Sequence, residues 1–172
     1  MEKSKIILKE LNASMVSPKY LKWMNSKSLM QYTEQRYSKT STRKIISFVK
    51  SKKKSKNEFL YGIFLTIEKK IIHVGNIKLG PINYIHKFAE ISYFIGDIKF
   101  QKMGIGTLAI KKVLEIAKKK FKLKKITASV YSNNIASTKV LIKNKFLLEG
   151  IQTKIYIYKN KRINHFLYGK LI

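Results

Sequence analysis

The chain has no cysteine and only three histidines among its 172 residues. Without cysteine there is no disulfide, no thiol nucleophile and no thiolate metal ligand, and His73, His86 and His165 lie too far apart in the sequence for a local ligand pair. We therefore predict no metal site. No apolar run approaches the roughly 18 residues that cross a bilayer, and the apolar centre of the N-terminal segment is too short for a secretory signal. A cytoplasmic protein with no membrane partner is expected.

Acidic residues are scarce as well: nine Asp and Glu stand against 37 Lys and Arg, which gives a formal net charge of +28. Such an excess is typical of nucleic-acid binding, because basic side chains neutralise phosphates and release counterions. Here only Arg36, Arg43 and Arg162 are arginines, the lysines are scattered, and Ile and Asn are abundant, as AT-biased codons produce. We interpret the charge as compositional and expect no specific nucleic acid partner. A basic nucleic-acid-binding module without turnover is the alternative function.

The hydrophobic content of 45% fits one globular domain over residues 1–172. The period of the apolar residues changes along the chain from helix-like to strand-like and back, which predicts an α/β (α+β) fold with a mixed sheet. In order, the predicted elements are a strand at Ile6–Leu11, helical pieces within Lys19–Met30, a helix at Thr42–Lys53 capped by Thr40 or Ser41, strands at Phe59–Ile67, Ile71–Leu79 and Phe88–Ile95, a helix from Ile105 to about Lys120, a strand at Lys125–Tyr131, a helix at Ile135–Lys143, and two or three closing strands within Phe146–Leu148, Ile155–Tyr158 and Phe166–Leu171.

Two glycines, Gly104 and Gly106, open the helix that follows the third strand of the predicted meander. Glycines at a helix start let the backbone approach a phosphate, and the first helical amides are unpaired donors at the positive end of the dipole. Gly104, Gly106 and Ala109 formally fit the GxGxxA dinucleotide pattern. Residues 97–103 separate the strand from the glycines, however, and the acidic residue expected about 20 positions further on is missing, which disfavours a Rossmann oxidoreductase. A glycine turn without a ligand stays open as an alternative.

These residues resemble a known family. Residues 101–106, QKMGIG, match the Q/RxxGxG/A signature of the GNAT superfamily of acetyl-CoA-dependent N-acetyltransferases. The FAEI stretch at residues 88–91 is similar to that of histone-type members, and Asn134, Ser137 and Phe146 are similar to the family's NxxS segment and closing phenylalanine. The resemblance covers residues 58–160 well and the N-terminal third loosely. It is nearest to the ribosomal-protein N-terminal and amino-sugar acetyltransferases.

The resemblance implies acetyl-CoA as the cofactor and a mostly antiparallel sheet, flanked by helices, in which two parallel central strands splay apart around the pantetheine arm. These strands would be residues 88–96 and 125–131, and the glycine loop would cradle the pyrophosphate. Strand amides near Phe94 and Ile95 would polarise the thioester carbonyl. The cofactor-binding residues that the resemblance implies are Phe94, Ile95, Gln101, Lys102, Met103, Gly104, Ile105, Gly106, Thr107 and Asn134.

The acceptor has to be a nucleophilic amine, and a lysine-like amine with a pKa near 10.4 is mostly protonated at pH 7, so a base is needed. The family places Glu90 beside the thioester, which makes it the candidate base, directly or through water. Its alternative role is a strand glutamate paired with a lysine. Leu141 stands where many members carry a tyrosine that protonates the leaving thiolate. Ribosomal-protein members that lack this tyrosine point to Ser137 as the acid, and a helix-start hydroxyl is its alternative.

Other polar and aromatic residues have less specific roles. We interpret Asp97 as structural, and Tyr93 as a packing residue unless it touches substrate. Trp23 and the segment Tyr32–Arg36, which includes Glu34, lie where related enzymes often build the acceptor pocket, although a buried Trp23 is the simpler prediction. The predicted reaction is direct attack of a primary amine, on a protein N-terminus or an amino sugar, in a ternary complex with acetyl-CoA. A homodimer is left open.

Overall fold

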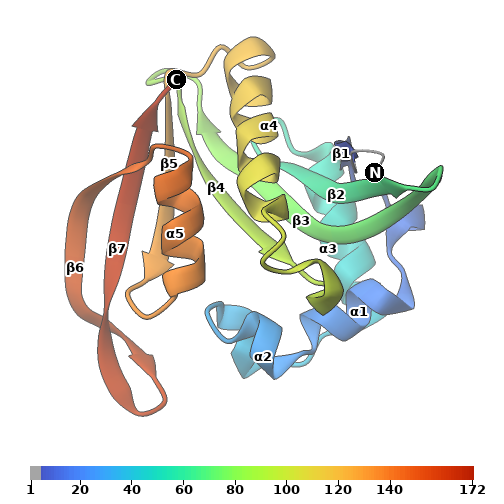
Figure 1. Ribbon diagram of the computed structural model, residues 1–172, viewed down its shortest axis with the longest axis horizontal. Helices are drawn as coiled ribbons and strands as arrows, with labels where there is room; N and C mark the ends of the chain where they lie inside the picture. The colour runs from blue at the N-terminus through green and yellow to red at the C-terminus, as the bar shows by residue number, and fades with distance from the viewer. Residues whose placement is uncertain (1–4) are drawn as a thin grey trace.

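The computed structural model describes residues 5–172, which form a seven-stranded sheet covered by helices on both faces (Figure 1). The strand order is β1-β2-β3-β4-β5-β7-β6, and all neighbours are antiparallel except β4 and β5. The strands are β1 (Lys5–Glu10), β2 (Phe59–Ile67), β3 (Lys70–Asn83), β4 (Phe88–Ile95), β5 (Lys125–Tyr131), β6 (Leu147–Tyr158) and β7 (Lys161–Leu171). The helices are α1 (Pro18–Met24), α2 (Lys27–Met30), α3 (Thr42–Lys54), α4 (Ile105–Lys119) and α5 (Ile135–Lys143), with short 3-10 turns η1 (Ala13–Met15), η2 (Glu34–Tyr37) and η3 (Ile98–Phe100).

The predicted mixed, mostly antiparallel sheet with flanking helices is confirmed, and the strand lengths differ from the prediction in two places. β3 continues through a bulge between Leu79 and Ile82, past the Gly80–Pro81 break at which the predicted strand ended. The closing segment forms two long strands, β6 and β7, instead of two or three short ones. β6 is an edge strand with most of its residues exposed, so it tolerates polar residues that the sequence pattern favours in loops.

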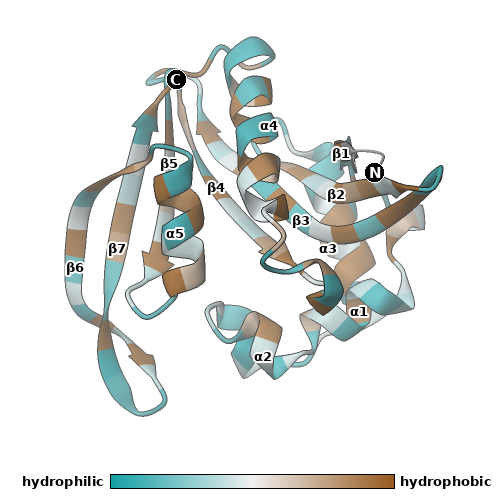
Figure 2. Cartoon of the chain, viewed as in Figure 1, coloured by the Kyte–Doolittle hydropathy of each residue, from teal (hydrophilic) through white to brown (hydrophobic). Residues whose placement is uncertain are grey.

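Both faces of β2 are buried, which explains its nearly continuous apolar run. Its Tyr61, Ile63 and Leu65 join the larger core beneath α4 and α5. Its Leu60 and Phe64 point to the opposite face and join a second core with residues of α1 and α3. Because successive strand residues point to opposite faces, a strand between two helical layers reads as apolar throughout. Figure 2 shows the hydrophobic residues on the central strands and on the inner sides of the helices.

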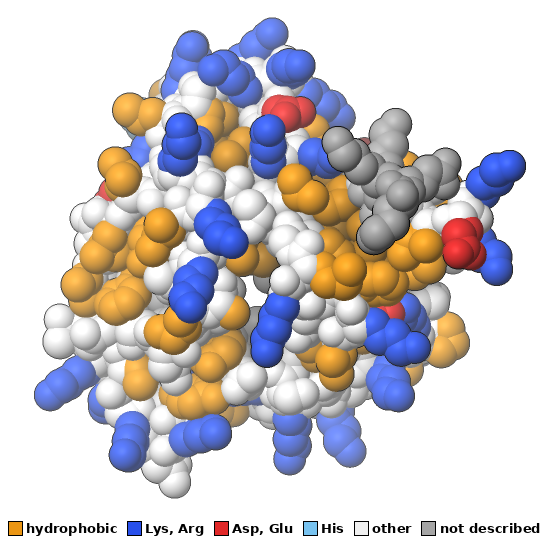
Figure 3. Space-filling view, viewed as in Figure 1, with side chains coloured by type: hydrophobic (Ala, Val, Ile, Leu, Met, Phe, Trp, Pro, Cys, Tyr) orange, Lys and Arg blue, Asp and Glu red, His pale blue; other side chains and the backbone are white. Residues whose placement is uncertain are grey.

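The positive charge is spread over the surface. Figure 3 shows Lys and Arg side chains distributed across the visible face, with few acidic side chains among them. Within residues 5–172, no helix is both long enough and apolar enough to cross a membrane.

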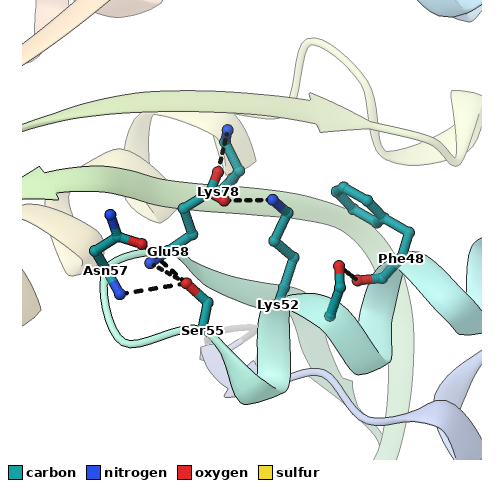
Figure 4. Close-up of polar contacts among 7 residues, drawn as sticks. Phe48, Lys52, Ser55, Asn57, Glu58 and Lys78 are labelled. Carbon is teal, nitrogen blue, oxygen red and sulfur yellow. Dashed lines mark hydrogen bonds and ion pairs between the residues drawn. The ribbon is translucent and has the colours of Figure 1, made fainter.

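One carboxylate, Glu58, holds two lysines at the connection between α3 and β2 (Figure 4). Lys52 of α3 donates to Glu58 Oε2 at 2.5 Å, and Lys78 of β3 donates to Glu58 Oε1 at 3.1 Å. The Ser55 hydroxyl accepts the Glu58 N–H at 2.9 Å and so fixes the turn. The hydrogen bond from Lys52 is the largest influence on the pKa of Glu58, and with Lys78 it holds that pKa below its ordinary value against the opposing effect of burial.

Replacing Glu58 by Gln should therefore lower the free energy of unfolding near pH 7 by about 1 kcal/mol, because the side chain is 22% exposed and solvent screens both pairs. A lowered folded-state pKa stabilises the protein above the unfolded pKa, near 4.3, and this contribution is lost as the pH falls through the folded value. The difference between wild type and Glu58→Gln should thus begin to shrink as the pH falls below about 4.3 and should vanish only below the folded pKa of Glu58. Urea unfolding at several pH values measures it. Glu68→Gln, exposed in the β2–β3 turn, is the control, and an equal loss there would contradict the assignment.

Candidate active site

The two parallel strands β4 and β5 are paired over only three residues each. The pairs run from Phe88 with Lys125 to Glu90 with Thr127, and the strands then separate, as Figure 1 shows. Beyond this point β4 stays paired with β3, and β5 stays paired with β7 as far as Tyr131. Each arm is therefore held on its outer side, and the inner backbone groups of both arms face the split between them.

The hydrogen-bond alternation of β4 decides which amides face this split. Gly96 N donates to Val74 O at 2.9 Å, which sets the phase of the ladder with β3. Because N–H groups of an antiparallel strand alternate in direction, the Phe94 N–H points to β3 and the Tyr93 and Ile95 N–H groups point into the split. Of the two strand positions that the resemblance implied, Ile95 thus offers its amide to the split and Phe94 does not.

The glycine loop leads from β4 to α4 and ends in a cluster of unpaired donors. Gly104 has a φ of 76° and is the N-cap of α4. The first backbone bond of the helix runs from Leu108 N to Gly104 O at 3.1 Å, so the N–H groups of Ile105, Gly106 and Thr107 have no partner within the helix. A Cβ placed on Gly104 would meet no atom within 4 Å, so its surroundings are open. The helix dipole makes this start electropositive.

Side chains of the loop hold its shape. Gln101 Nε2 donates to Ile95 O at 2.9 Å, while Lys102 and Met103 extend their side chains into solvent. Asp97 accepts Lys19 Nζ at 2.5 Å and the Lys99 N–H at 3.1 Å. Burial acts to raise the pKa of Asp97, but the bonds from Lys19 and Lys99 outweigh it and lower that pKa. This placement agrees with a structural role for Asp97.

Trp23 packs at the end of β4 against Phe94, which points to the same face of the strand as Glu90. Its indole is 4% exposed and packs against Phe94 and His73, with ring centroids 6.2 and 5.1 Å away. The indole also covers Gly96, where a Cβ would overlap it. Trp23 is thus a core residue that fixes the start of the glycine loop.

Glu90 lies at the point where β4 and β5 part. Its side chain is exposed, and its Oε1 accepts the Ser129 hydroxyl of β5 at 2.9 Å. Among the described residues, its partner is thus a serine rather than a lysine. Burial lowers the pKa of His165 on β7, and the charge of Glu90 partly opposes this effect. Sequence reasoning missed Ser129, although the predicted splay of the strands together with strand alternation could have shown it.

An aromatic cluster continues the Glu90 side of the sheet. Tyr131 Oη donates to Glu34 Oε1 at 2.7 Å, and burial followed by this bond raises the pKa of Tyr131 to about 12. Tyr32 stacks on Tyr158 with centroids 5.4 Å apart, and the Arg36 guanidinium lies 5.1 Å from the Tyr131 ring. Tyr32, Glu34 and Arg36 therefore lie close together, and their place in an acceptor pocket stays a prediction. Tyr131 and Tyr158 join them from distant parts of the sequence.

The same contacts connect η2 and the end of α2 to the β6–β7 hairpin. Arg36 donates to Ile157 O at 3.0 Å, and Tyr158 Oη donates to Gln31 Oε1 at 2.6 Å. Tyr32 Oη reaches Asn133 O, in the turn after β5, at 3.3 Å. In Figure 1, α2 lies below the open end of the split and the hairpin lies beside it. The segment from α2 to η2 is thus bonded to the far arm of the split.

On the other face, α5 lines the split. Asn134 caps α5, since its Oδ1 accepts the Ser137 N–H at 3.2 Å. Ser137 in the first turn lies against Tyr93 of β4. Leu141, one turn further along, is fully buried in the main core. The structure thus brings Ser137 to the β4 arm and leaves Asn134 in a capping role. Within residues 5–172, no group of three or more His, Asp or Glu side chains could hold a metal ion.

In this structure two parallel strands part beside the amide-rich start of a helix, and a carboxylate lies at the point where they part. The sequence resemblance predicts this arrangement for an acyltransferase fold. A family model described as an acetyltransferase (GNAT) domain matches residues 5–147. The probable N-acetyltransferase YjcK of Bacillus subtilis (strain 168) is 32% identical over 119 residues, which cover 69% of this chain and 64% of that protein. The chain belongs to the GNAT acetyltransferase family. It matches less than two thirds of the length of this curated relative.

Solved structures share the fold at low sequence identity. A spermidine N-acetyltransferase from Vibrio cholerae, in complex with CoA and spermine, has a TM-score of 0.84 at 19% identity and covers 96% of this chain and 95% of that one. The ribosomal-protein alpha-N-acetyltransferase RimL, in complex with coenzyme A, has a TM-score of 0.84 at 20% identity, with 97% and 94% covered. Identities this low show the shared fold alone.

Replacing Gly96 by Ala should destabilise the protein by about 1 to 3 kcal/mol, because the added methyl overlaps the buried Trp23 indole. Gly150→Ala on β6 is the matched control, since its Cβ would meet Leu167 at an ordinary 3.6 Å. Chemical unfolding of both variants measures the difference. Equal stability of the two variants would show that Trp23 can move away from β4 without cost.

Proposed function

We propose that this protein is an N-acetyltransferase that transfers an acetyl group from acetyl-CoA to a primary amine by direct attack in a ternary complex. The observation that carries the proposal is the parting of β4 and β5 after Glu90 and Thr127, beside the unpaired amides of α4. Membership of the acetyltransferase family supports the same reaction.

The residues at the start of α4 fit the pyrophosphate of acetyl-CoA. The N–H groups of Ile105, Gly106 and Thr107 lack helical partners, and an anion is the ligand that such a helix start favours. Gly104 keeps the approach open, because its φ of 76° suits glycine and no atom lies within 4 Å of its Cβ position. Lys102 adds an exposed positive charge in the same loop.

When bound, acetyl-CoA supplies the thioester carbonyl that the amine attacks. The inward N–H groups of β4, those of Tyr93 and Ile95, are fixed donors for the charge that develops on a carbonyl oxygen in the split. They need no rearrangement, because the ladder with β3 holds the strand in place.

Glu90 is the residue placed to take the proton of the amine. Its Oε1 is oriented by the Ser129 hydroxyl, which leaves Oε2 for an acceptor or a water. The lowered pKa of His165 keeps its imidazole neutral near pH 7, so it does not add a positive charge beside an incoming ammonium. Ser129 is thus a positioning residue for Glu90.

The acceptor site lies on the Glu90 side of the sheet, where Tyr131, Tyr158 and Glu34 meet. A primary amine on a protein N-terminus or on an amino sugar suits an aromatic wall that carries one carboxylate. Solved neighbours are a ribosomal-protein alpha-N-acetyltransferase and a spermidine N-acetyltransferase. An acceptor screen should therefore compare an N-terminal peptide, an amino sugar and spermidine, with release of the CoA thiol as the readout.

Replacing Gly104 by Val should weaken acetyl-CoA binding at least tenfold, or about 1.4 kcal/mol, because the side chain blocks the approach to the helix amides. The open space around Gly104 means that the protein itself offers no collision, so the fold should persist with a modest loss of stability from its positive φ. Titration calorimetry measures the affinity. Gly150→Val on the edge strand β6 should leave it unchanged. If a folded Gly104→Val variant kept wild-type affinity for acetyl-CoA, the glycine loop would be a turn that binds no ligand.

Glu90→Gln should leave acetyl-CoA affinity within about threefold and reduce turnover near pH 7 by about 10² or more, the usual scale for a general base. The amide oxygen can still accept the Ser129 hydroxyl, so the loss reports on proton transfer rather than on position. Raising the pH should recover part of the rate, and recovery should begin at lower pH for an α-amine than for a lysine-like amine.

Glu115→Gln on the exposed side of α4 is the control for Glu90→Gln, because it removes the same charge away from the split. Wild-type turnover in Glu90→Gln across pH 6 to 9 would make Glu90 structural and leave the base to water.

A further inference from the structure

The loop that carries the glycines starts from a fixed point at the end of β4. The N–H groups of Gly96 and Asp97 both donate to Val74 O of β3, at 2.9 and 3.2 Å. From there the chain turns through η3, where Phe100 N donates to Asp97 O at 3.0 Å, and continues to Gly104 at the start of α4. Asp97 is thus the residue that makes the last bond to the sheet and the first bond of the turn.

The two carboxylate oxygens of Asp97 have different partners. Oδ1 accepts the N–H of Lys99 at 3.1 Å and so caps η3. Oδ2 accepts the ammonium of Lys19, in the first turn of α1, at 2.5 Å. Within residues 5–172, Lys19 makes the one ion pair of this carboxylate. The loop is thereby bonded to a helix that lies far from it in the sequence.

Lys19 is held in place by its own helix. Its Nζ lies 5.4 Å from the ring centroid of Trp23, four residues further along α1, in a cation–π contact. The same indole covers Gly96, the residue before Asp97. Helix α1 therefore contacts two consecutive residues of the loop, Gly96 through an apolar ring and Asp97 through a charge.

The rest of the loop has little apolar packing of its own. Of residues 98–104, all are exposed except Phe100 and Gln101, which are half-buried. Segments with few buried apolar contacts open easily, so hydrogen bonds and ion pairs determine the shape of this one. Gln101 Nε2 braces the loop against Ile95 O, and Lys19 braces it against α1.

We propose that Lys19 is a positioning residue of the cofactor site: by holding Asp97 it fixes the loop in the shape that presents the unpaired amides at the start of α4 to a diphosphate. This assignment rests on the proposed acetyltransferase function. Lys19 lies in the N-terminal third of the chain, which resembles the family only loosely, so its place beside the loop emerges from the fold.

Lys19→Met tests the assignment, because it removes the charge and keeps an unbranched side chain that suits a helix. The dissociation constant of CoA, measured by calorimetry, should rise about fivefold, the upper range for a partly exposed ion pair. The kcat should stay within about twofold, because Glu90 and the amides of β4 are unchanged. Lys19→Arg keeps an ion pair and should retain wild-type affinity. Lys22→Met, exposed on the same helix, is the matched control and should retain it too.

Asp97→Asn separates position from charge, and it tests the proposal even where Lys19→Met does not fold. The asparagine oxygen can still accept the Lys99 N–H, but the ion pair is lost. A positioning role predicts an affinity loss of about three- to fivefold, and the double variant should bind CoA no more weakly than the weaker single variant. If Asp97→Asn binds CoA as tightly as wild type or more tightly, Lys19 only neutralises a carboxylate, which overturns the assignment.

An ion pair that serves stability alone would give a different result. Lys19→Met would then unfold at a lower urea concentration than wild type and would bind CoA as tightly as Lys22→Met, which also overturns the assignment. The proposed function would stand in either case, because wild-type turnover and acetyl-CoA binding test it separately. A wild type that binds no CoA overturns both.

Discussion

The site depends on one feature of the sheet: β4 and β5 are hydrogen-bonded over three residue pairs and then part, while each stays bonded to its outer neighbour. Backbone amides and carbonyls left open in the middle of a sheet cost free energy unless water or a ligand satisfies them. The parting therefore leaves backbone groups whose hydrogen bonds a polar, extended ligand could satisfy. The parting of β4 and β5 determines what lies beside the split: the Tyr93 and Ile95 amides, the Glu90 carboxylate and the start of α4.

Side chains connect the elements around the split on both faces of the sheet. On one face Arg36 and Tyr158 connect the α2–η2 segment to the β6–β7 hairpin. On the other face Tyr93 reaches the first turn of α5 at Ser137. A hydrogen bond between two sides of the split restrains them only as far as the elements that carry its donor and its acceptor are themselves fixed by packing. Helix α4 is well packed, with seven buried residues, whereas α5 has one and the short turn η2 has none.

The sequence predicted the helix start and the carboxylate because both belong to short local patterns, the glycines after β4 and the FAEI stretch within it. Ser129, Tyr131 and Tyr158 escaped prediction because their partners Glu90, Glu34 and Gln31 lie 39 to 127 residues away in the chain. Such contacts follow from strand order and register, which periodicity does not determine. The predicted burial of Trp23 is confirmed, but its contact with Gly96, directly after β4, could be seen only from the packing.

The net charge of +28 acts on this site mainly at long range. At physiological ionic strength the Debye length is about 8 Å, so scattered surface lysines contribute little to the energy of a group inside the split. They do raise the concentration of anions near the surface and hence the encounter rate of the proposed cofactor, which carries several phosphates. The proposed reaction therefore depends on charged groups close to the split. Glu90 and Glu34, two of only nine carboxylates, lie on the side of the sheet proposed for the acceptor, where an arriving ammonium would otherwise meet mostly positive side chains.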